Sequence, residues 1–202
     1  MARILVVFGT RPEAIKMFPV VHQLRATEGI ETLVAVTAQH RELLDQVLDI
    51  AGILPDVDLD LMRPSQSLDE LSSRILLSFG KVLDDLQPDR VLVHGDTLTT
   101  MVVSLSAYFR KIPVGHVEAG LRSGDRRMPE ERNRLVTDAL ADILFTFSAD
   151  ADANLRAENV PERCIFCVGN LMIDTLLRFR AKAGESHILE EAGVEPGAYA
   201  LA

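Results

Sequence analysis

The chain alternates short apolar runs with longer segments in which apolar residues recur every three to four positions. The short runs are rich in β-branched residues and predict buried strands, whereas the longer segments have the spacing of amphipathic helices. We expect strands at 4–8, 32–36, 91–93, 114–117, 144–147 and 165–168, and helices at 12–25, 42–50, 68–86, 98–109, 130–141, 149–158 and 171–183.

Strands that alternate with helices and are apolar on both faces are typical of a parallel sheet covered by helices on both sides. We therefore predict an α/β fold with a doubly wound, Rossmann-like parallel sheet over residues 1–184. Residues 185–202 are polar, contain Gly and Pro, and end in an apolar stretch that resembles a new strand. We interpret 185–202 as a linker and the start of a missing C-terminal domain.

Composition and charge narrow the functional classes. The chain has 202 residues, 48% of them hydrophobic, and a net charge of −9, which argues against a general nucleic-acid binder. No apolar run reaches the roughly 20 residues of a membrane span, and no leader precedes the first strand. We therefore expect a cytoplasmic protein that binds neither nucleic acid nor membrane.

The two cysteines, Cys164 and Cys167, are too few for a disulfide scaffold or a zinc site. Residues 163–168 have the pattern of a strand, where positions three apart point to opposite faces. We expect two buried, inert thiols and no metal.

Three polar motifs follow the predicted strands at 4–8, 91–93 and 114–117: FGTRPEAIK, HGD and GHVEAGLR. The carboxyl ends of parallel strands meet at one edge of the sheet, where ligands bind in open α/β folds. We therefore expect the three motifs to line a single site.

The first motif has the features of an anion-binding helix start. Thr10 and Glu13 have the spacing of a capping box, and the free N–H groups of the first turn lie near two cations, Arg11 and Lys16. The plain alternative is a well-capped first helix with two solvated cations. Neither a G-x-G-x-x-G fingerprint nor a P-loop is present, which argues against a nicotinamide-dependent oxidoreductase and an ATPase.

Carboxylates dominate the other motifs. Asp96 is either a helix N-cap or a functional group, and the sequence leaves both open. Glu118 leaves a buried strand, where a carboxylate is costly unless it is paired, and Arg122 could pair with it. Glu130 suits a helix start on dipole grounds, with Arg134 four residues later.

Two histidines, His94 and His116, accompany these carboxylates, and we interpret both as satisfied core histidines rather than catalysts. Neighbouring cations can separate the pKa values of clustered carboxylates, so proton transfer is a plausible chemistry for the site.

With these residues assembled, the chain resembles the N-terminal domain of the non-hydrolysing UDP-N-acetylglucosamine 2-epimerases. The matching segments are 8–19, 36–48, 91–97, 112–125, 129–134 and 168–174. The resemblance implies one half of a two-domain enzyme of the glycosyltransferase-B type, with its site between the domains. It also implies a homodimer, no cofactor, and a role in polysaccharide biosynthesis. The implied reaction interconverts UDP-GlcNAc and UDP-ManNAc by elimination of UDP to a 2-acetamidoglucal and re-addition.

Carried onto this sequence, the resemblance assigns proton transfer to three carboxylates and substrate binding to four cations: Asp96, Glu118 and Glu130, and Arg11, Lys16, Arg122 and Arg134. A possible allosteric site matches at Gln39, His40 and Gln66. Glu42 and Ser65 stand where allosteric relatives have glutamine and arginine, which argues against activation by substrate. The loop at 125–128 is shorter than in many relatives.

Other functions stay open. The family's second domain supplies a catalytic histidine and most UDP contacts, so the 202-residue chain alone is expected to be inactive. The alternatives are a non-catalytic UDP-sugar-binding or dimerisation module, a hydrolysing 2-epimerase that releases ManNAc and UDP, and a glycosyltransferase of the same architecture. The three carboxylates make the glycosyltransferase the weakest of these.

Overall fold

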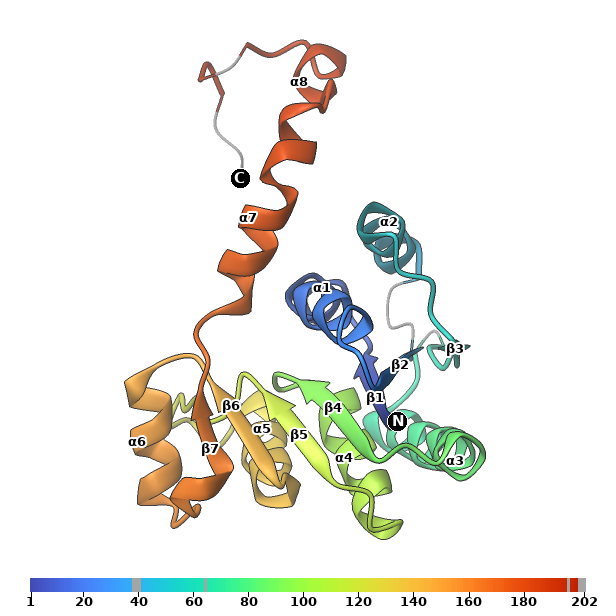
Figure 1. The fold of residues 1–202 in the computed structure, drawn as a ribbon, viewed down its shortest axis with the longest axis vertical. Coiled ribbons are helices and arrows are strands. Elements are labelled where there is room, and N and C mark those ends of the chain that lie inside the picture. The colour runs from blue at the N-terminus through green and yellow to red at the C-terminus, as the bar shows by residue number, and fades with distance from the viewer. Residues whose placement is uncertain (38–40, 64, 196, 200–202) are drawn as a thin grey trace.

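The computed structural model describes residues 1–37, 41–63, 65–195 and 197–199. Its seven strands form one parallel sheet in the order β3-β2-β1-β4-β5-β6-β7 (Figure 1). The strands are β1 (Ala2–Phe8), β2 (Ile30–Val36), β3 (Val57–Asp58), β4 (Arg90–His94), β5 (Val114–Val117), β6 (Ile143–Thr146) and β7 (Ile165–Cys167). The helices are α1 (Arg11–Arg25), α2 (Arg41–Ala51), α3 (Leu68–Leu86), α4 (Leu98–Phe109), α5 (Pro129–Leu140), α6 (Ala149–Ala157), α7 (Leu171–Gly184) and α8 (Ile188–Glu191).

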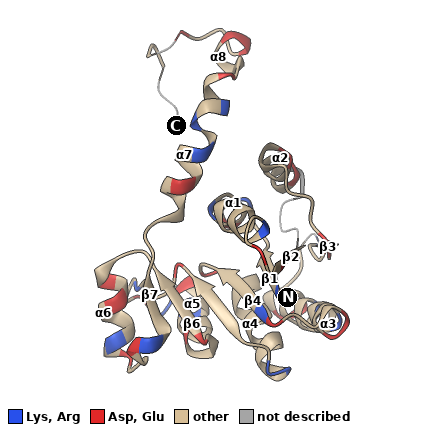
Figure 2. Cartoon of the chain, in the orientation of Figure 1, with Lys and Arg blue, Asp and Glu red and all other residues tan. Residues whose placement is uncertain are grey.

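The predicted doubly wound sheet is confirmed, because alternate residues of its strands pack against helices on opposite faces. Leu5 and Val7 of β1 belong to a core that α3 and α4 cover, whereas Val6 and Phe8 belong to a core that α1, α2 and α7 cover. Figure 2 shows the consequence, since charged residues concentrate on the helices and the central strands carry almost none.

The strand order places a switch point between β1 and β4. From β1 the chain builds outward through β2 and β3, and from β4 it builds outward in the other direction to β7. The carboxyl edge of the sheet is where ligands bind in open α/β folds. All three predicted motifs begin at this edge.

The predicted elements lie within about two residues of the observed ones, with two omissions and one error. The omissions are the two-residue β3 and the short α8. The error concerns the cysteines: Cys164 ends a 3₁₀ turn at Glu162–Cys164 and is half-buried, while Cys167 lies on the edge strand β7 and is exposed. An edge strand has one neighbour only, so it leaves Cys167 in solvent instead of in a core.

The helix α7 leaves the carboxyl edge and rises away from the sheet along α1 (Figure 1). Thr175 donates to the carbonyl of Ile15 at 2.7 Å, and Phe179 meets Phe18 edge-on. Its other side exposes a row of apolar residues: Met172, Ile173, Leu176 and Leu177. Residues 198–199 lie outside any strand, and 200–202 lie outside the described residues, so the predicted domain boundary at 184 stays a prediction. None of the described helices combines the length and apolar composition needed to cross a membrane.

Candidate active site

The loop from β1 into α1 is held by one buried carboxylate, Glu13. Its Oε2 accepts the N–H groups of Gly9 and Thr10, each at 2.7 Å, and completes the predicted capping box. Its Oε1 accepts the hydroxyl groups of Thr97 at 2.7 Å and Thr100 at 3.2 Å, both on the neighbouring loop and helix. Glu13 therefore ties the first motif to the second.

The second motif turns at Gly95, whose φ of +72° lies in the left-handed region that glycine tolerates best. Thr97, not Asp96, is the N-cap of α4, because its hydroxyl accepts the N–H of Thr100 at 3.2 Å. Asp96 is therefore not the N-cap of α4, which was one of the two roles left open for it, and its carboxylate does not bond the start of that helix.

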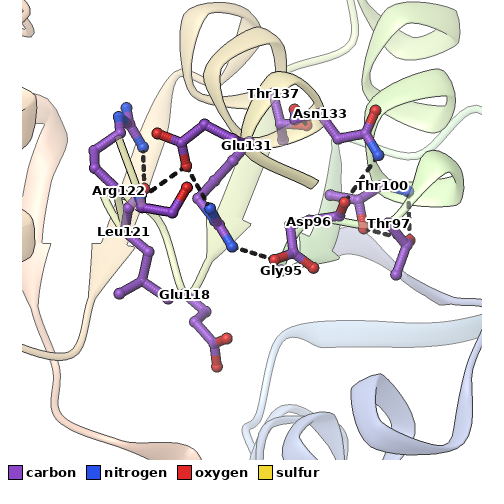
Figure 3. A network of polar contacts seen from close by, with 12 residues as sticks. Gly95, Asp96, Thr97, Thr100, Glu118, Leu121, Arg122, Glu131, Asn133 and Thr137 are labelled. Carbon is purple, nitrogen blue, oxygen red and sulfur yellow. Dashed lines mark hydrogen bonds and ion pairs between the residues drawn. The ribbon is translucent and has the colours of Figure 1, made fainter. Parts of the chain in front are cut away.

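Helix α5 meets this turn directly (Figure 3). Asn133 donates to the backbone carbonyl of Asp96 at 2.9 Å, and Arg134 pairs with the Asp96 carboxylate. Arg134 also binds Glu131 at 2.7 Å, and the Glu131 carboxylate accepts the N–H groups of Ser123 at 3.0 Å and Gly124 at 3.1 Å. Asp96 is thus fixed through a chain of ionic contacts that reaches the loop after the third motif.

The carboxylate of Glu118 lies apart from that chain and points away from it (Figure 3). Its backbone φ of +67° is uncommon for a residue other than glycine, and such backbone strain is concentrated at functional sites. Lys16 donates to Oε2 at 2.6 Å, and Nε2 of His94 lies 3.3 Å from the same oxygen. Burial alone would raise the pKa of Glu118, but His94 and Lys16 outweigh burial and lower it from 4.5 to about 2. Glu118 is therefore ionised at neutral pH.

Two ion pairs that the sequence left open do not form. Arg122 pairs with Asp138 at 2.8 Å and with Glu158 at 2.5 Å, and not with Glu118. Arg134 bonds Glu131 rather than Glu130, because Glu131 faces the interior beside Arg134 while Glu130 is exposed. Both arginines are thus occupied by protein carboxylates in this structure.

The two remaining predicted residues of the motifs, Arg11 and Glu130, are exposed at the first turns of α1 and α5. Among the described residues no hydrogen bond or ion pair engages either side chain. Glu131, which the sequence reasoning passed over, is 2% exposed. The signal that could have found it is its i,i+3 spacing to Arg134.

A small pocket joins the ends of β4, β5, β6 and β7. It is lined by His94, Val117, Glu118, Phe145, Phe147, Val168, Gly169, Asn170 and Leu171. His94 is 3% exposed, its Nε2 faces the Glu118 carboxylate at 3.3 Å, and its Nδ1 has no hydrogen-bond partner in the described part of the chain, so it is buried as expected but only partly satisfied. A buried imidazole with one unpaired nitrogen beside Glu118 offers a polar contact to whatever enters this pocket.

The possible allosteric residues are only partly described. Gln39 and His40, and the side chain of Glu42, lie outside the described residues. Gln66 is half-buried and contacts the sulfur of Met62 at 3.0 Å. In the described part of the chain, no three His, Cys, Asp or Glu side chains are grouped so that they could hold a metal ion.

The model of the UDP-N-acetylglucosamine 2-epimerase family matches residues 22–202. The chain belongs to this family. A UDP-N-acetylglucosamine 2-epimerase of Salmonella typhimurium is 50% identical over 190 residues, which are 93% of this chain and 50% of that protein.

Solved structures of family members agree with the observed fold. The UDP-GlcNAc 2-epimerase of Neisseria meningitidis bound to UDP-GlcNAc superimposes with a TM-score of 0.89 at 46% identity, over 94% of this chain and 52% of that one. The Methanocaldococcus jannaschii enzyme in complex with UDP-GlcNAc and UDP gives a TM-score of 0.88 at 35% identity, over 94% and 52%. The chain therefore spans about half the length of its epimerase relatives.

Proposed function

We propose that the chain is the N-terminal half of a UDP-N-acetylglucosamine 2-epimerase that interconverts UDP-GlcNAc and UDP-ManNAc. The observation that carries the proposal is the pair of carboxylates, Asp96 and Glu118, at one sheet edge of an epimerase-family fold. Each is held against a cation from another element, Arg134 and Lys16 respectively.

Inversion at C2 needs a base and an acid around an unactivated carbon. In the proposed reaction a base removes the C2 proton while the bond between C1 and the UDP oxygen breaks, which gives a 2-acetamidoglucal and UDP. The UDP oxygen then adds back to C1 as a proton returns to the other face of C2. Glu118, ionised at neutral pH, suits proton abstraction, and Asp96 and Glu130 complete the carboxylate set without a division of roles among the three.

The departing pyrophosphate is anionic and needs stabilisation as it leaves. The start of α1 supports this role, because Arg11 is exposed at its first turn and Lys16 pairs with Glu118 at the same sheet edge. Arg122 and Arg134 are bound to protein carboxylates in this structure. To contact substrate, each would have to exchange a carboxylate partner for the substrate.

The proposal includes a second domain and a homodimer. The exposed apolar row of α7 is a surface that the other half of an epimerase could cover. We propose that residues 185–202 are the linker to that second domain. The proposed enzyme is cytoplasmic, uses no cofactor, and is inactive as the 202-residue chain alone.

The test uses the full-length protein encoded by the gene. Incubation with UDP-GlcNAc in D2O should place deuterium at C2 and form UDP-ManNAc, both followed by proton NMR. Asp84→Asn is the matched control, because this exposed carboxylate pairs with Arg110 near the amino edge of the sheet. The control should exchange at the parent rate.

Other products would change the assignment. Free ManNAc and UDP as sole products indicate a hydrolysing 2-epimerase. UDP-sugar binding by calorimetry without exchange or a new sugar indicates a non-catalytic binding module, and with that result the epimerase proposal fails.

A further inference from the structure

His116 sits in the centre of the sheet and has a polar partner on each ring nitrogen. It is fully buried, with Nδ1 2.6 Å from the Asp138 carboxylate of α5 and Nε2 2.7 Å from the carbonyl of Gly95. A carboxylate and a carbonyl are both acceptors, so each contact needs a hydrogen on the nitrogen that faces it. A neutral imidazole carries only one such hydrogen and would turn a bare lone pair toward the other acceptor.

The groups around the ring balance a positive charge. Asp138 also accepts Arg122 at 2.8 Å and the N–H of Gly120 at 3.2 Å, and Glu158 at the end of α6 accepts Arg122. With the ring protonated, two cations and two carboxylates compensate one another. With the ring neutral, Arg122 alone would face both carboxylates, of which Asp138 is buried and Glu158 is exposed. Burial would raise the pKa of Asp138, but His116 and Arg122 lower it, which keeps the acceptor ionised.

The ring connects this cluster to the predicted catalytic carboxylate. Gly95 directly precedes Asp96, and its N–H bonds the carbonyl of Val117 at 2.9 Å. His116 holds the carbonyl oxygen of Gly95, which belongs to the peptide group between Gly95 and Asp96. Asn133 holds the following carbonyl oxygen, that of Asp96, at 2.9 Å. The turn is clamped at successive backbone oxygens.

We propose that His116 is a buried imidazolium that acts as a positioning residue for Asp96. Asp138 holds the ring at Nδ1, and the ring in turn holds the carbonyl of Gly95 at Nε2. The part that concerns Asp96 in catalysis rests on the proposed epimerase function, whereas the charge state of the ring does not. His116 touches no reacting atom in this role.

Nitrogen-15 NMR of the chain labelled at histidine tests the charge state. Because both ring contacts are to acceptors, His116 should show two protonated nitrogens at neutral pH. The signal is assigned by its loss in His116→Gln. His187→Gln, at an exposed histidine, serves as the control and should leave the signal unchanged. A single protonated nitrogen near neutral pH would overturn the charge assignment.

Two variants at the same position separate positioning from packing. The amide nitrogen of glutamine can take the place of Nε2 and keep the bond to Gly95, while that of asparagine can take the place of Nδ1 and keep only the bond to Asp138. We expect His116→Asn to lower kcat about 10- to 100-fold and His116→Gln to lower it much less, with KM little changed in both.

The backbone provides a readout that needs no turnover. The amide signals of Gly95 and Asp96 should shift in His116→Asn and stay near their parent positions in His116→Gln. Equal shifts and equal kcat in the two folded variants would refute positioning. If the parent protein does not turn over UDP-GlcNAc, the epimerase proposal fails, and the amide shifts and ring spectra still decide the role of His116.

Discussion

His94 ends β4 and His116 is the third residue of β5, and both rings are buried beside the predicted catalytic carboxylates. His116 has an acceptor on each nitrogen and belongs to a charge-balanced cluster. His94 faces the Glu118 carboxylate at 3.3 Å through Nε2, has no hydrogen-bond partner on Nδ1 among the described residues, and lines the pocket with Glu118. Similar places in adjacent strands therefore serve different ends: one ring completes the scaffold, while the other leaves bonding capacity for a ligand.

The carboxylates divide in the same way. Glu13, Glu131 and Asp138 each accept at least three hydrogen bonds or ion pairs from the protein and are almost fully buried. Glu118 receives its contacts on Oε2 alone and keeps about a fifth of its side chain exposed, 21%. A saturated carboxylate holds structure, whereas one that retains free lone pairs can exchange a proton. Substitutions at the two kinds of carboxylate should therefore affect activity and stability differently.

The largest effect is expected at Glu118. Glu118→Gln removes the proposed proton acceptor and should lower deuterium incorporation at C2 about 10³-fold. The protein should stay folded, with a loss of no more than about 2 kcal/mol in the free energy of unfolding, since only its ion pair is lost. Exchange by NMR and urea unfolding measure the two quantities. Retention of a tenth or more of the parent exchange rate would show that Glu118 is not the essential base.

A substitution at Asp138 should instead have its main effect on stability. Asp138→Asn leaves His116 and Arg122 facing a neutral amide and should cost about 3 kcal/mol of unfolding free energy. Urea unfolding of the 202-residue chain measures this cost. Asp85→Asn, at an exposed site on α3, is the control and should stay within about 0.5 kcal/mol of the parent. A cost for Asp138→Asn as small as that of the control would mean that the cluster contributes nothing to stability.

The strand-helix pattern predicted the fold because period and apolar run length report directly on which face of each element is buried. It also placed Asp96, Glu118 and Lys16 at one edge, since parallel topology brings strand ends together. What it could not predict are contacts set by helix rotation and loop path. Arg122 turns to Asp138 and Glu158 because of the way the loop leaves β5, which no spacing in the sequence encodes.

The adjacent glutamates show the same limit. The dipole argument treats Glu130 and Glu131 alike, and family resemblance selects Glu130. Only the rotation of α5 shows that Glu131 faces inward to Arg134 while Glu130 faces solvent. Position along the chain identified the helix turn, but the direction of each side chain needed the structure.

Glu130 and Glu131 therefore provide the third test. Glu131→Gln should cost about 2 kcal/mol of unfolding free energy, because two backbone N–H groups and Arg134 lose a charged acceptor. Glu130→Gln should change stability by less than about 0.5 kcal/mol and, under the proposed function, still abolish most of the C2 exchange. Urea unfolding and exchange NMR on both variants check this. If the stabilities fall equally, the inward and outward assignment is wrong.

The last expected effect is the pH dependence that Glu118 contributes to stability. Its pKa in the folded chain is lowered from 4.5 to about 2, so the unfolded chain binds the proton first as the pH falls. The stabilisation is thus complete above about pH 4.5 and is lost as the pH falls toward 2; it amounts to about 2 kcal/mol once the partial exposure of the side chain is allowed for. Urea unfolding of the parent chain and Glu118→Gln should show this gap at about pH 7, roughly 40% of it at about pH 3, and little of it at about pH 2. A gap that stays constant with pH would mean that Lys16 and His94 hold Glu118 by geometry and not by charge, and Glu118 would then join the scaffold carboxylates from which it has been distinguished.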